Sequence, residues 1–188
     1  CDDVVRNREV LPKLWKSGLR WVLLGVENPR ESTLEAFRKN ITARDSIEAV
    51  KLLKENGIFA QAMFIIGERK DTYKSIENLR GFVDELDPDL AIFTILTPFP
   101  GTELYDEAKR NGWIEDLNWA NYDMIHAIMP TETLSRTEVQ EELYNCYSTF
   151  YGSWSRRLEG LFSRNELVRR YYSYMVTRGI VKQLKTLI

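Results

Sequence analysis

Three short and almost wholly apolar segments constrain the fold of this chain more than any other feature. They are residues 20–28 (RWVLLGVEN), 59–67 (FAQAMFIIG) and 90–96 (LAIFTIL). Their apolar residues fall on both faces, which is typical of strands that are covered on both sides in a parallel sheet. Helical patterns at residues 42–56 and 72–86 separate the three segments. The sequence therefore predicts an α/β fold in which three parallel strands alternate with helices.

Polar residues follow two of these segments at the point where each strand should end. Glu27 comes at the end of the first, and Gly67 and Glu68 end the second. Because the carboxyl ends of parallel strands meet at one rim, where α/β proteins bind ligands, these residues are candidates for ligand contacts. Glu27 is the first candidate, since a carboxylate is a strong acceptor for a charged donor. The alternative for Glu27 is a surface acid that caps the next helix.

The remaining pattern is mainly helical and divides the chain near residue 112. Asn7 is a candidate cap for a helix that runs to Lys16, but Pro12 favours a start near Val10, which puts the proline in the first turn. Further helices are expected at residues 102–110, 134–154 and 165–178, with an irregular segment at 113–133 and Gly179 as the end of the last helix. We expect a first unit at 1–112 and a second, an irregular segment with a helical extension, at 113–188.

Composition excludes several classes of protein. The 188 residues include two cysteines, Cys1 and Cys146, which lack the spacing of a disulfide framework or a zinc site. The sequence contains no run of 18 apolar residues and no signal peptide, so we expect a cytoplasmic location. The formal net charge of −2 gives no reason to expect a nucleic acid as partner. The chain opens at Cys1 without methionine, and we expect it to be a fragment of a longer protein.

A succession of short motifs resembles a known family. The order is GVEN, KENGI, FIIGE, LDPDLAIF and then TPFPGTELYDEAKRNG. This order resembles the later half of radical S-adenosylmethionine (SAM) enzymes of the class that carries an N-terminal cobalamin-binding domain. Within this class, CDDVVRN and YDMIHAIMPTETLSRTEVQEELYNCYSTFYG are most similar to the anaerobic magnesium-protoporphyrin IX monomethyl ester oxidative cyclases.

The resemblance implies the later half of a partial (β/α) barrel with a C-terminal helical extension. It also implies early strands with a C-x-x-x-C-x-x-C loop, whose [4Fe-4S] cluster cleaves SAM to a 5'-deoxyadenosyl radical. This chain contains no such triplet. We therefore expect the intact protein to use the cluster, SAM and cobalamin, and the fragment alone to hold none of them, to have no metal site and to be inactive.

The resemblance also assigns site residues. Glu27 and Asn28 match the strand end at which the family places polar contacts to SAM or substrate. Ile65 and Gly67 match the G-x-I-x-G-x-x-E element beside the adenine, and Glu68 follows Gly67 directly.

The chain departs from this element at three points. Met63 stands at the first glycine and Lys70 at the acid, and related enzymes often read GLPGET where this chain reads GERKDT. Glu68 therefore need not perform the function of that acid.

Several candidates have structural alternatives. Gly67 could admit a ligand or could serve a tight turn. The loop that contains Pro98, Pro100 and Gly101 could line the substrate side of the site or could simply be rigid. His126 and Cys146 are expected to be structural.

The basic and aromatic tail at residues 154–185 could contact a membrane surface, an anionic substrate or a partner domain. We favour contact with the missing N-terminal half of the barrel and the cobalamin domain. The leading hypothesis is a cyclase-like enzyme acting on a small-molecule substrate such as a porphyrin. The alternatives are a radical SAM methyltransferase and a non-catalytic α/β binding module, and an open edge strand could pair with a second copy.

Overall fold

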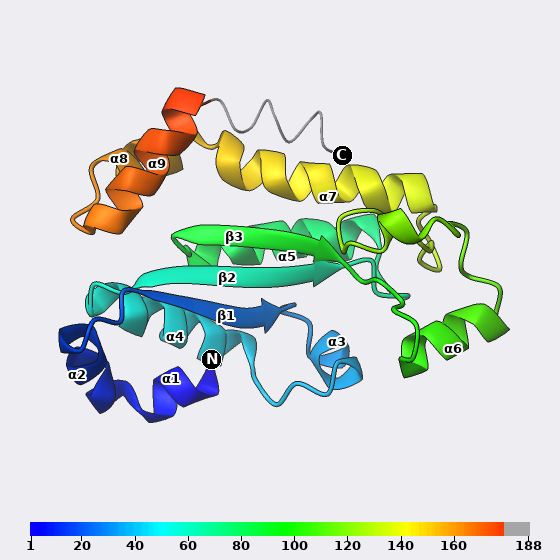
Figure 1. Cartoon of the computed structure of the whole chain (residues 1–188), viewed down its shortest axis with the longest axis horizontal. Helices are drawn as coiled ribbons and strands as arrows, with labels where there is room; N and C mark the ends of the chain where they lie inside the picture. The colour runs from blue at the N-terminus through cyan, green and yellow to red at the C-terminus, as the bar shows by residue number, and fades with distance from the viewer. Residues whose placement is uncertain (179–188) are drawn as a thin grey trace.

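The computed structural model describes residues 1–178 and confirms the predicted parallel sheet (Figure 1). Strands β1 (Trp21–Glu27), β2 (Phe59–Ile66) and β3 (Leu90–Ile95) lie side by side in chain order, and both neighbouring pairs are parallel. All three carboxyl ends therefore lie at one rim, and this end of the sheet is the right-hand side of Figure 1.

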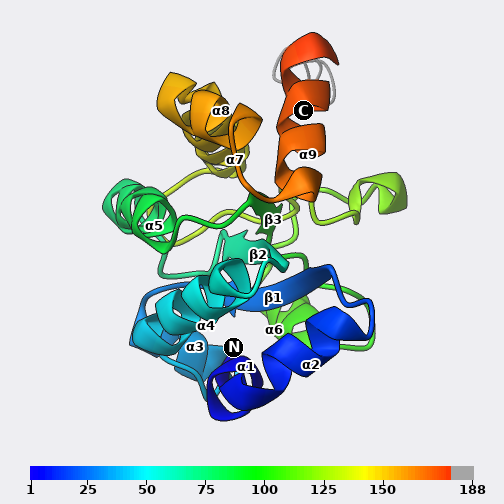
Figure 2. The same cartoon turned by 90° about the vertical axis from the view of Figure 1, so that its left-hand side faces the viewer.

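One face of the sheet is fully covered by helices. Helices α4 (Ala43–Glu55) and α5 (Tyr73–Leu86) lie on this side, and α7 (Arg136–Gly152) packs beside β3 (Figure 2). The buried strand residues of this face share a core with the helices; they are Leu24, Val26, Ala60, Ala62, Phe64, Ile66, Ala91, Phe93 and Ile95. The covered face supplies the hydrophobic burial that stabilises the fold.

The covering helices begin where the sequence predicts. Thr42 and Thr72 cap α4 and α5, and each cap side chain accepts a hydrogen bond from the main chain three residues later. Ser135 and Glu138 form the same reciprocal arrangement at the start of α7. Each capping box satisfies main-chain donors that a helix leaves unpaired in its first turn.

The opposite face of the sheet is only partly covered. There, Val168 and Tyr172 of helix α9 (Glu166–Arg178) pack on Phe59 and Leu90. Further along β1 the face is open, and Leu23 is 54% exposed. The open face and the rim therefore meet at the end of β1.

The other described helices are short and lie around the sheet. They are α1 (Asp2–Arg6), a 3-10 turn (Arg8–Val10), α2 (Leu11–Lys16), α3 (Glu31–Ala36), α6 (Glu103–Arg110), a second 3-10 turn (Trp119–Asn121) and α8 (Trp154–Leu161). Within residues 1–178 no helix combines the length and the apolar character needed to cross a bilayer.

Two sequence predictions were wrong in detail. Asn7 caps no helix: its side chain donates to the carbonyl of Asp3 at 2.9 Å, at the end of α1. The predicted helix at 134–154 is interrupted at Ser153, whose extended backbone starts α8. Pro12 does lie in the first turn of α2, where its missing N–H costs little. Gly179 lies outside the described residues.

The outer edge of β3 is sealed by tyrosines of α7. The Tyr151 hydroxyl donates to the carbonyl of Ala91 at 2.7 Å, and the Tyr147 hydroxyl donates to the carbonyl of Phe93 at 2.9 Å. The Tyr147 hydroxyl also accepts the N–H of Phe93. These side chains satisfy main-chain groups that a neighbouring strand would otherwise bind.

Candidate ligand-binding rim

The end of β1 is strained at Glu27. Its φ is 64°, and the N–H of Asn28 donates to the carbonyl of Val26 at 2.8 Å across it. The register of β1 on β2 also shifts between Gly25 and Glu27. A non-glycine residue in this backbone region costs about 1–2 kcal/mol, and such strain is concentrated at functional sites.

The strained turn places the Glu27 carboxylate over Gly25. A Cβ at position 25 would lie 2.6 Å from Glu27 Oε1 and 3.3 Å from Lys39 Nζ. The two charged groups form an ion pair at 2.8 Å, with the Glu27 side chain 12% exposed. Because residue 25 alternates with Leu24 and Val26 of the core, the pair lies on the open face of the sheet.

Asn28 and Arg30 connect the end of β1 to the end of β2. The Asn28 amide donates to the carbonyl of Ile65 at 3.5 Å and accepts the N–H of Arg30 at 3.0 Å. The Arg30 guanidinium continues across the rim to Glu68 at 3.0 Å and to Asp71 at 2.9 Å. The rim is therefore held together by polar groups as well as by the sheet.

Asp71 closes the loop that follows β2. One of its carboxylate oxygens accepts the N–H groups of Gly67 at 2.9 Å and Glu68 at 3.1 Å. The other accepts bonds from Arg30 and from the Ser75 hydroxyl at 3.0 Å. Desolvation raises the pKa of this buried carboxyl, although Arg30 and the hydrogen bonds act in the opposite direction.

Asp71, Arg30 and Lys39 were missed from the sequence. For Asp71 a signal was available, because it is the fifth letter of GERKDT and the fifth letter of GLPGET is also an acid. No local pattern pointed to Lys39 or Arg30, since their partners lie 12 residues or more away in sequence.

The predicted residues of β2 face different ways. Ile65 lies on the face opposite its core neighbours Phe64 and Ile66. Gly67 has a φ of 81°, and a Cβ there would lie 3.2 Å from both Ile95 and Val139 on the covered face. The turn and this packing account for Gly67 without a ligand. Glu68 binds Arg30 and the N–H of Lys70 at 3.0 Å, and so stabilises the loop.

The loop after β3 is a tight turn. The N–H of Thr102 donates to the carbonyl of Phe99 at 3.1 Å, across Pro100 and Gly101. Gly101 has a φ of 86°, and proline followed by such a glycine is the signature of a type II turn. Pro98 is buried, whereas Pro100 and Gly101 are exposed. Turn geometry therefore explains these residues, and contacts of the loop to a substrate remain a prediction.

His126 and Cys146 make structural interactions outside the rim. His126 Nδ1 lies 2.8 Å from a carboxylate oxygen of Asp123, and Cys146 is buried in the core. Burial raises the pKa of the Cys146 thiol to about 12. Among the described residues there is no group of three or more histidines, cysteines and carboxylates that could hold a metal ion.

The arrangement at the rim suits a polar organic ligand. Glu27 and Lys39 offer an acceptor and a cation side by side on the open face, and the Ile65 side chain adds apolar surface there. Glu27 and Asn28 come together with Ile65 and Glu68 across neighbouring strands, as predicted for the end of a parallel sheet.

Comparison with known proteins identifies related sequences. The model of the radical SAM superfamily matches residues 1–83. The chain is 34% identical to an uncharacterized methyltransferase of Pyrococcus horikoshii, over 77% of this chain and 32% of that protein. It is 33% identical to the anaerobic magnesium-protoporphyrin IX monomethyl ester cyclase of Cereibacter sphaeroides, over 79% of this chain and 24% of that protein.

A third relative matches over almost the whole chain. The bacteriochlorophyllide d C-8(2)-methyltransferase of Chlorobaculum tepidum is 27% identical over 97% of this chain and 41% of its own length. The chain thus spans less than half the length of each of these three relatives.

The fold also matches a solved structure. Elp3 of Methanocaldococcus infernus, with residues 1–46 deleted, superposes with a TM-score of 0.51 and 18% identity, over 77% of this chain and 39% of that one. At this identity the match supports the fold alone, and the fold is that of a partial barrel. Taken with the parallel strands and the sequence relatives, these matches show that the chain belongs to the radical SAM superfamily.

Proposed function

We propose that this chain is the later part of the catalytic barrel of a cytoplasmic, cobalamin-dependent radical SAM enzyme that acts on a tetrapyrrole as an oxidative cyclase. The observation that carries the proposal is the Glu27–Lys39 pair, held at a strained strand end on the open face of the sheet. The names of relatives such as the Cereibacter sphaeroides cyclase support a tetrapyrrole as substrate.

The rim residues fit SAM better than they fit the iron–sulfur cluster. SAM carries an ammonium group and ribose hydroxyls, which a carboxylate such as Glu27 can accept, and an adenine that can pack on an apolar side chain such as Ile65. The described residues supply no ligand set for a cluster, so its ligands would have to come from elsewhere in the intact protein. Together with that cluster, bound SAM would supply a 5'-deoxyadenosyl radical.

The chain's own residues bind and orient in this proposal. Glu27 accepts a hydrogen bond from the ammonium or ribose of SAM, and Lys39 fixes the direction of that carboxylate. Asn28 ties the end of β1 to Ile65 of β2, so that both contacts keep a constant spacing. Arg30 and Asp71 hold the loop after β2 closed beside them.

A radical SAM methyltransferase is the second candidate. The relatives from Pyrococcus horikoshii and Chlorobaculum tepidum are both named as methyltransferases, and the second is named for a bacteriochlorophyllide. Cyclase activity is preferred because the opening CDDVVRN and the segment from Tyr122 onward are most similar to that family.

One experiment tests both candidates. The intact protein, purified without oxygen, is assayed for iron, sulfide, cobalamin and release of 5'-deoxyadenosine on reduction. It is then given magnesium-protoporphyrin IX monomethyl ester, and separately a bacteriochlorophyllide, with SAM labelled with carbon-13 at its methyl group. An unlabelled cyclised product supports the cyclase, and a labelled product supports the methyltransferase. A protein that binds no iron contradicts radical chemistry and favours the non-catalytic binding module.

A further inference from the structure

Helix α8 carries a stripe of large apolar side chains that face solvent. Trp154, Leu158 and Phe162 are 72%, 52% and 81% exposed. Their spacing of four residues puts them on one side of the helix and its last turn. We call these three residues the α8 stripe. Single exposed apolar residues are ordinary on a protein surface, but three aligned ones mark a contact.

The exposure of the stripe follows from firm anchoring of the other side of α8. Arg156 forms ion pairs with Asp87 at 2.7 Å and with Asp84 at 3.2 Å, both at the end of α5. Gly160 is buried so tightly against Tyr172 of α9 that a Cβ there would lie 2.2 Å from its ring. These contacts fix the rotation of α8, so the stripe must point away from the protein.

One arginine contacts the stripe and three others follow it closely in sequence. The Arg157 guanidinium lies 5.2 Å from the Trp154 ring centroid. Arg164 is exposed just beyond Phe162, and exposed Arg169 donates to the carbonyl of Ser163 at 2.6 Å. Arg170 is also exposed, and it pairs with Glu166 at 2.6 Å.

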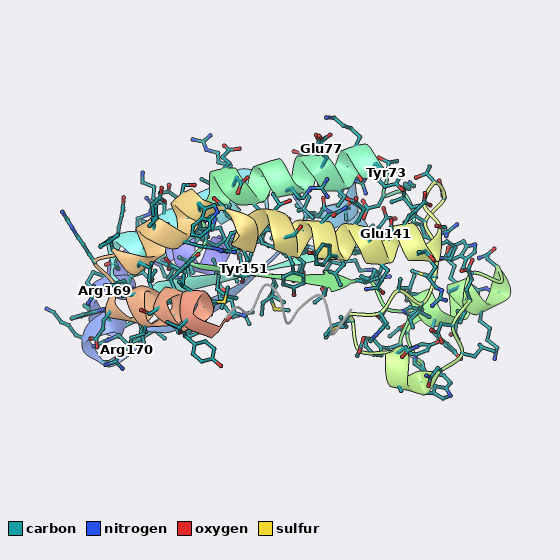
Figure 3. All side chains as sticks on the ribbon, turned by 90° about the horizontal axis from the view of Figure 1, so that it is seen from above. Tyr73, Glu77, Glu141, Tyr151, Arg169 and Arg170 are labelled. Carbon is teal, nitrogen blue, oxygen red and sulfur yellow. The ribbon has the colours of Figure 1, made fainter. Side chains whose placement is uncertain are left out.

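Basic residues outnumber acidic ones in and between α8 and α9: residues 154–170 contain five arginines and two glutamates. Figure 3 shows Arg169 and Arg170 at the end formed by α8 and α9, whereas Glu77 and Glu141 lie over α5 and α7. Glu166 is paired with Arg170, and the other acid of these two helices, Glu159, is exposed. The surroundings of the stripe are therefore basic.

We propose that the α8 stripe docks on the anionic surface of a lipid bilayer. Tryptophan, leucine and phenylalanine on one side of a helix with arginines beside them is the pattern of helices that lie in the headgroup region. The apolar side chains enter the boundary of the acyl chains, and the arginines meet the lipid phosphates. The inference does not depend on which substrate the enzyme takes.

The size of the stripe favours a lipid surface over a protein partner. A helix of eight residues is about 12 Å long, and a stable protein interface needs about 800 Å² from each partner. Three protruding side chains on a short helix supply too little area for such an interface, but each can enter a fluid bilayer separately.

Vesicle flotation tests the proposal. The purified protein is mixed with vesicles of phosphatidylcholine alone or with phosphatidylglycerol added, and the bound fraction is measured. We expect binding to the anionic vesicles, at least about tenfold weaker binding to neutral vesicles, and weaker binding as salt is raised. Absence of binding to anionic vesicles would overturn the proposal.

Two sets of variants locate the contact. Replacing all three stripe residues by serine should lower vesicle binding at least about tenfold. The double variant Leu117→Ser/Trp119→Ser is the matched control, because these side chains are 78% and 60% exposed at the far end of the molecule. Circular dichroism confirms that each variant is folded. Equal loss in the control, or unchanged binding of the stripe variant, contradicts the assignment.

Variants of two arginines, and quenching of tryptophan emission, test the membrane contact independently. Arg164→Gln and Arg169→Gln should each weaken binding about fivefold and reduce its salt dependence. Vesicles with brominated acyl chains should quench tryptophan emission, and Trp154→Phe should remove most of that quenching. If the stripe variant instead turns a dimer into a monomer and leaves vesicle binding unchanged, the stripe binds protein and the proposal fails.

Discussion

Arg30 Nη2 lies 2.9 Å from Asp71 Oδ1, and this ion pair joins the end of β1 to the loop after β2. The Asp71 side chain is 2% exposed, whereas that of Arg30 is 30% exposed. The carboxylate therefore depends on Arg30 and its hydrogen bonds to remain charged inside the protein. Two helices and a strand lie between the two residues in sequence, so the pair forms only when the rim is folded.

Arg30→Met should open the rim. Asp71 would keep its amide donors and lose its cation, and we expect the free energy of unfolding to fall by about 1–3 kcal/mol. Urea denaturation measures the change. Arg38→Met is the control, because the Arg38–Glu103 pair is 81% and 86% exposed and such pairs contribute about 0–1 kcal/mol. Equal effects of the two substitutions would contradict a structural role for Arg30.

Glu27→Gly should lower SAM affinity strongly and change the free energy of unfolding only slightly. Glycine relieves the strain at a φ of 64° but loses the Lys39 ion pair, so stability should change by less than about 1 kcal/mol. SAM affinity of the intact protein, measured by calorimetry, should fall at least about tenfold. Glu27→Gln keeps the strain and removes the charge, and it should weaken binding to a similar degree. Normal SAM affinity in both variants would remove Glu27 from the site.

Gly25→Ala should displace the Glu27 carboxylate. The new methyl would lie 2.6 Å from Oε1, and the carboxylate is the flexible end of a side chain, so it should move with little loss of stability. SAM affinity of the intact protein should fall. The control is Gly81→Ala, because a Cβ there meets no atom within 4 Å in α5, and alanine should add about 0.5–1 kcal/mol to stability. Unchanged SAM affinity in Gly25→Ala would contradict this geometry.

Asp89 should give the stability a dependence on pH. Desolvation raises its pKa above 3.8, although its carboxylate accepts the N–H of Ala60 at 2.8 Å. A raised pKa means that the folded state binds the proton more tightly, so this stabilisation is complete below 3.8 and is lost as pH rises through the folded value. Relative to Asp89→Asn, the wild type should therefore be most stable below pH 3.8 and become less stable as pH rises toward 7. Denaturation at several pH values measures the difference, and a constant difference would contradict the shift.

Cys146 should not react with iodoacetamide in the folded protein. Its thiol is fully buried, and a pKa of about 12 leaves roughly 10⁻⁴ of it as thiolate at pH 8. Cys1 is only partly buried and should react first. Mass spectrometry of the undigested 188-residue chain with Cys1→Ser should therefore show no label until denaturant is added. Labelling of that variant at the rate of a free thiol would show that α7 opens readily.

The sheet could be predicted from sequence because its strands are marked locally. Each apolar run ends at a glycine, a polar residue or a proline, and the structure ends β1, β2 and β3 within two residues of those points. The caps Thr42 and Thr72 could likewise be predicted, since a capping box depends only on residues three positions apart.

The less regular helices could not be predicted in the same way. The break at Ser153 lies inside an apolar periodicity that continues from 134 to 154, which hid the local signal of Gly152 followed by the serine that caps α8. Tertiary contacts of Arg156 and Gly160 then fix α8 in place. The helical stretch at the start of the chain is divided into α1, a 3-10 turn and α2, and pieces of five or six residues are too short for separate periodicities to be visible.

Among the rim residues, Glu27 could be predicted from a local pattern, whereas Lys39, Arg30 and Asp71 were not predicted. Glu27 follows a recognisable strand, so its place was evident, and the structure adds that it pairs with a cation. Lys39 and Arg30 reach their partners only after the chain has folded, and single-sequence patterns do not record such contacts. Asp71 was hidden because the residue before it, Lys70, was aligned with the family's acid.

Because Tyr147 and Tyr151 cover the outer edge of β3, a further strand can be added to the sheet only beside β1. Hydroxyls of α7 occupy the main-chain groups of Ala91 and Phe93, so no further strand can be added beyond β3 without unfolding that helix. Within the described residues, β1 is the other edge of the sheet and pairs with β2 alone. Any additional strand, whether from the same polypeptide or from a second copy, must therefore pair with β1, and a barrel built on this sheet can be extended from that side and stays open at β3.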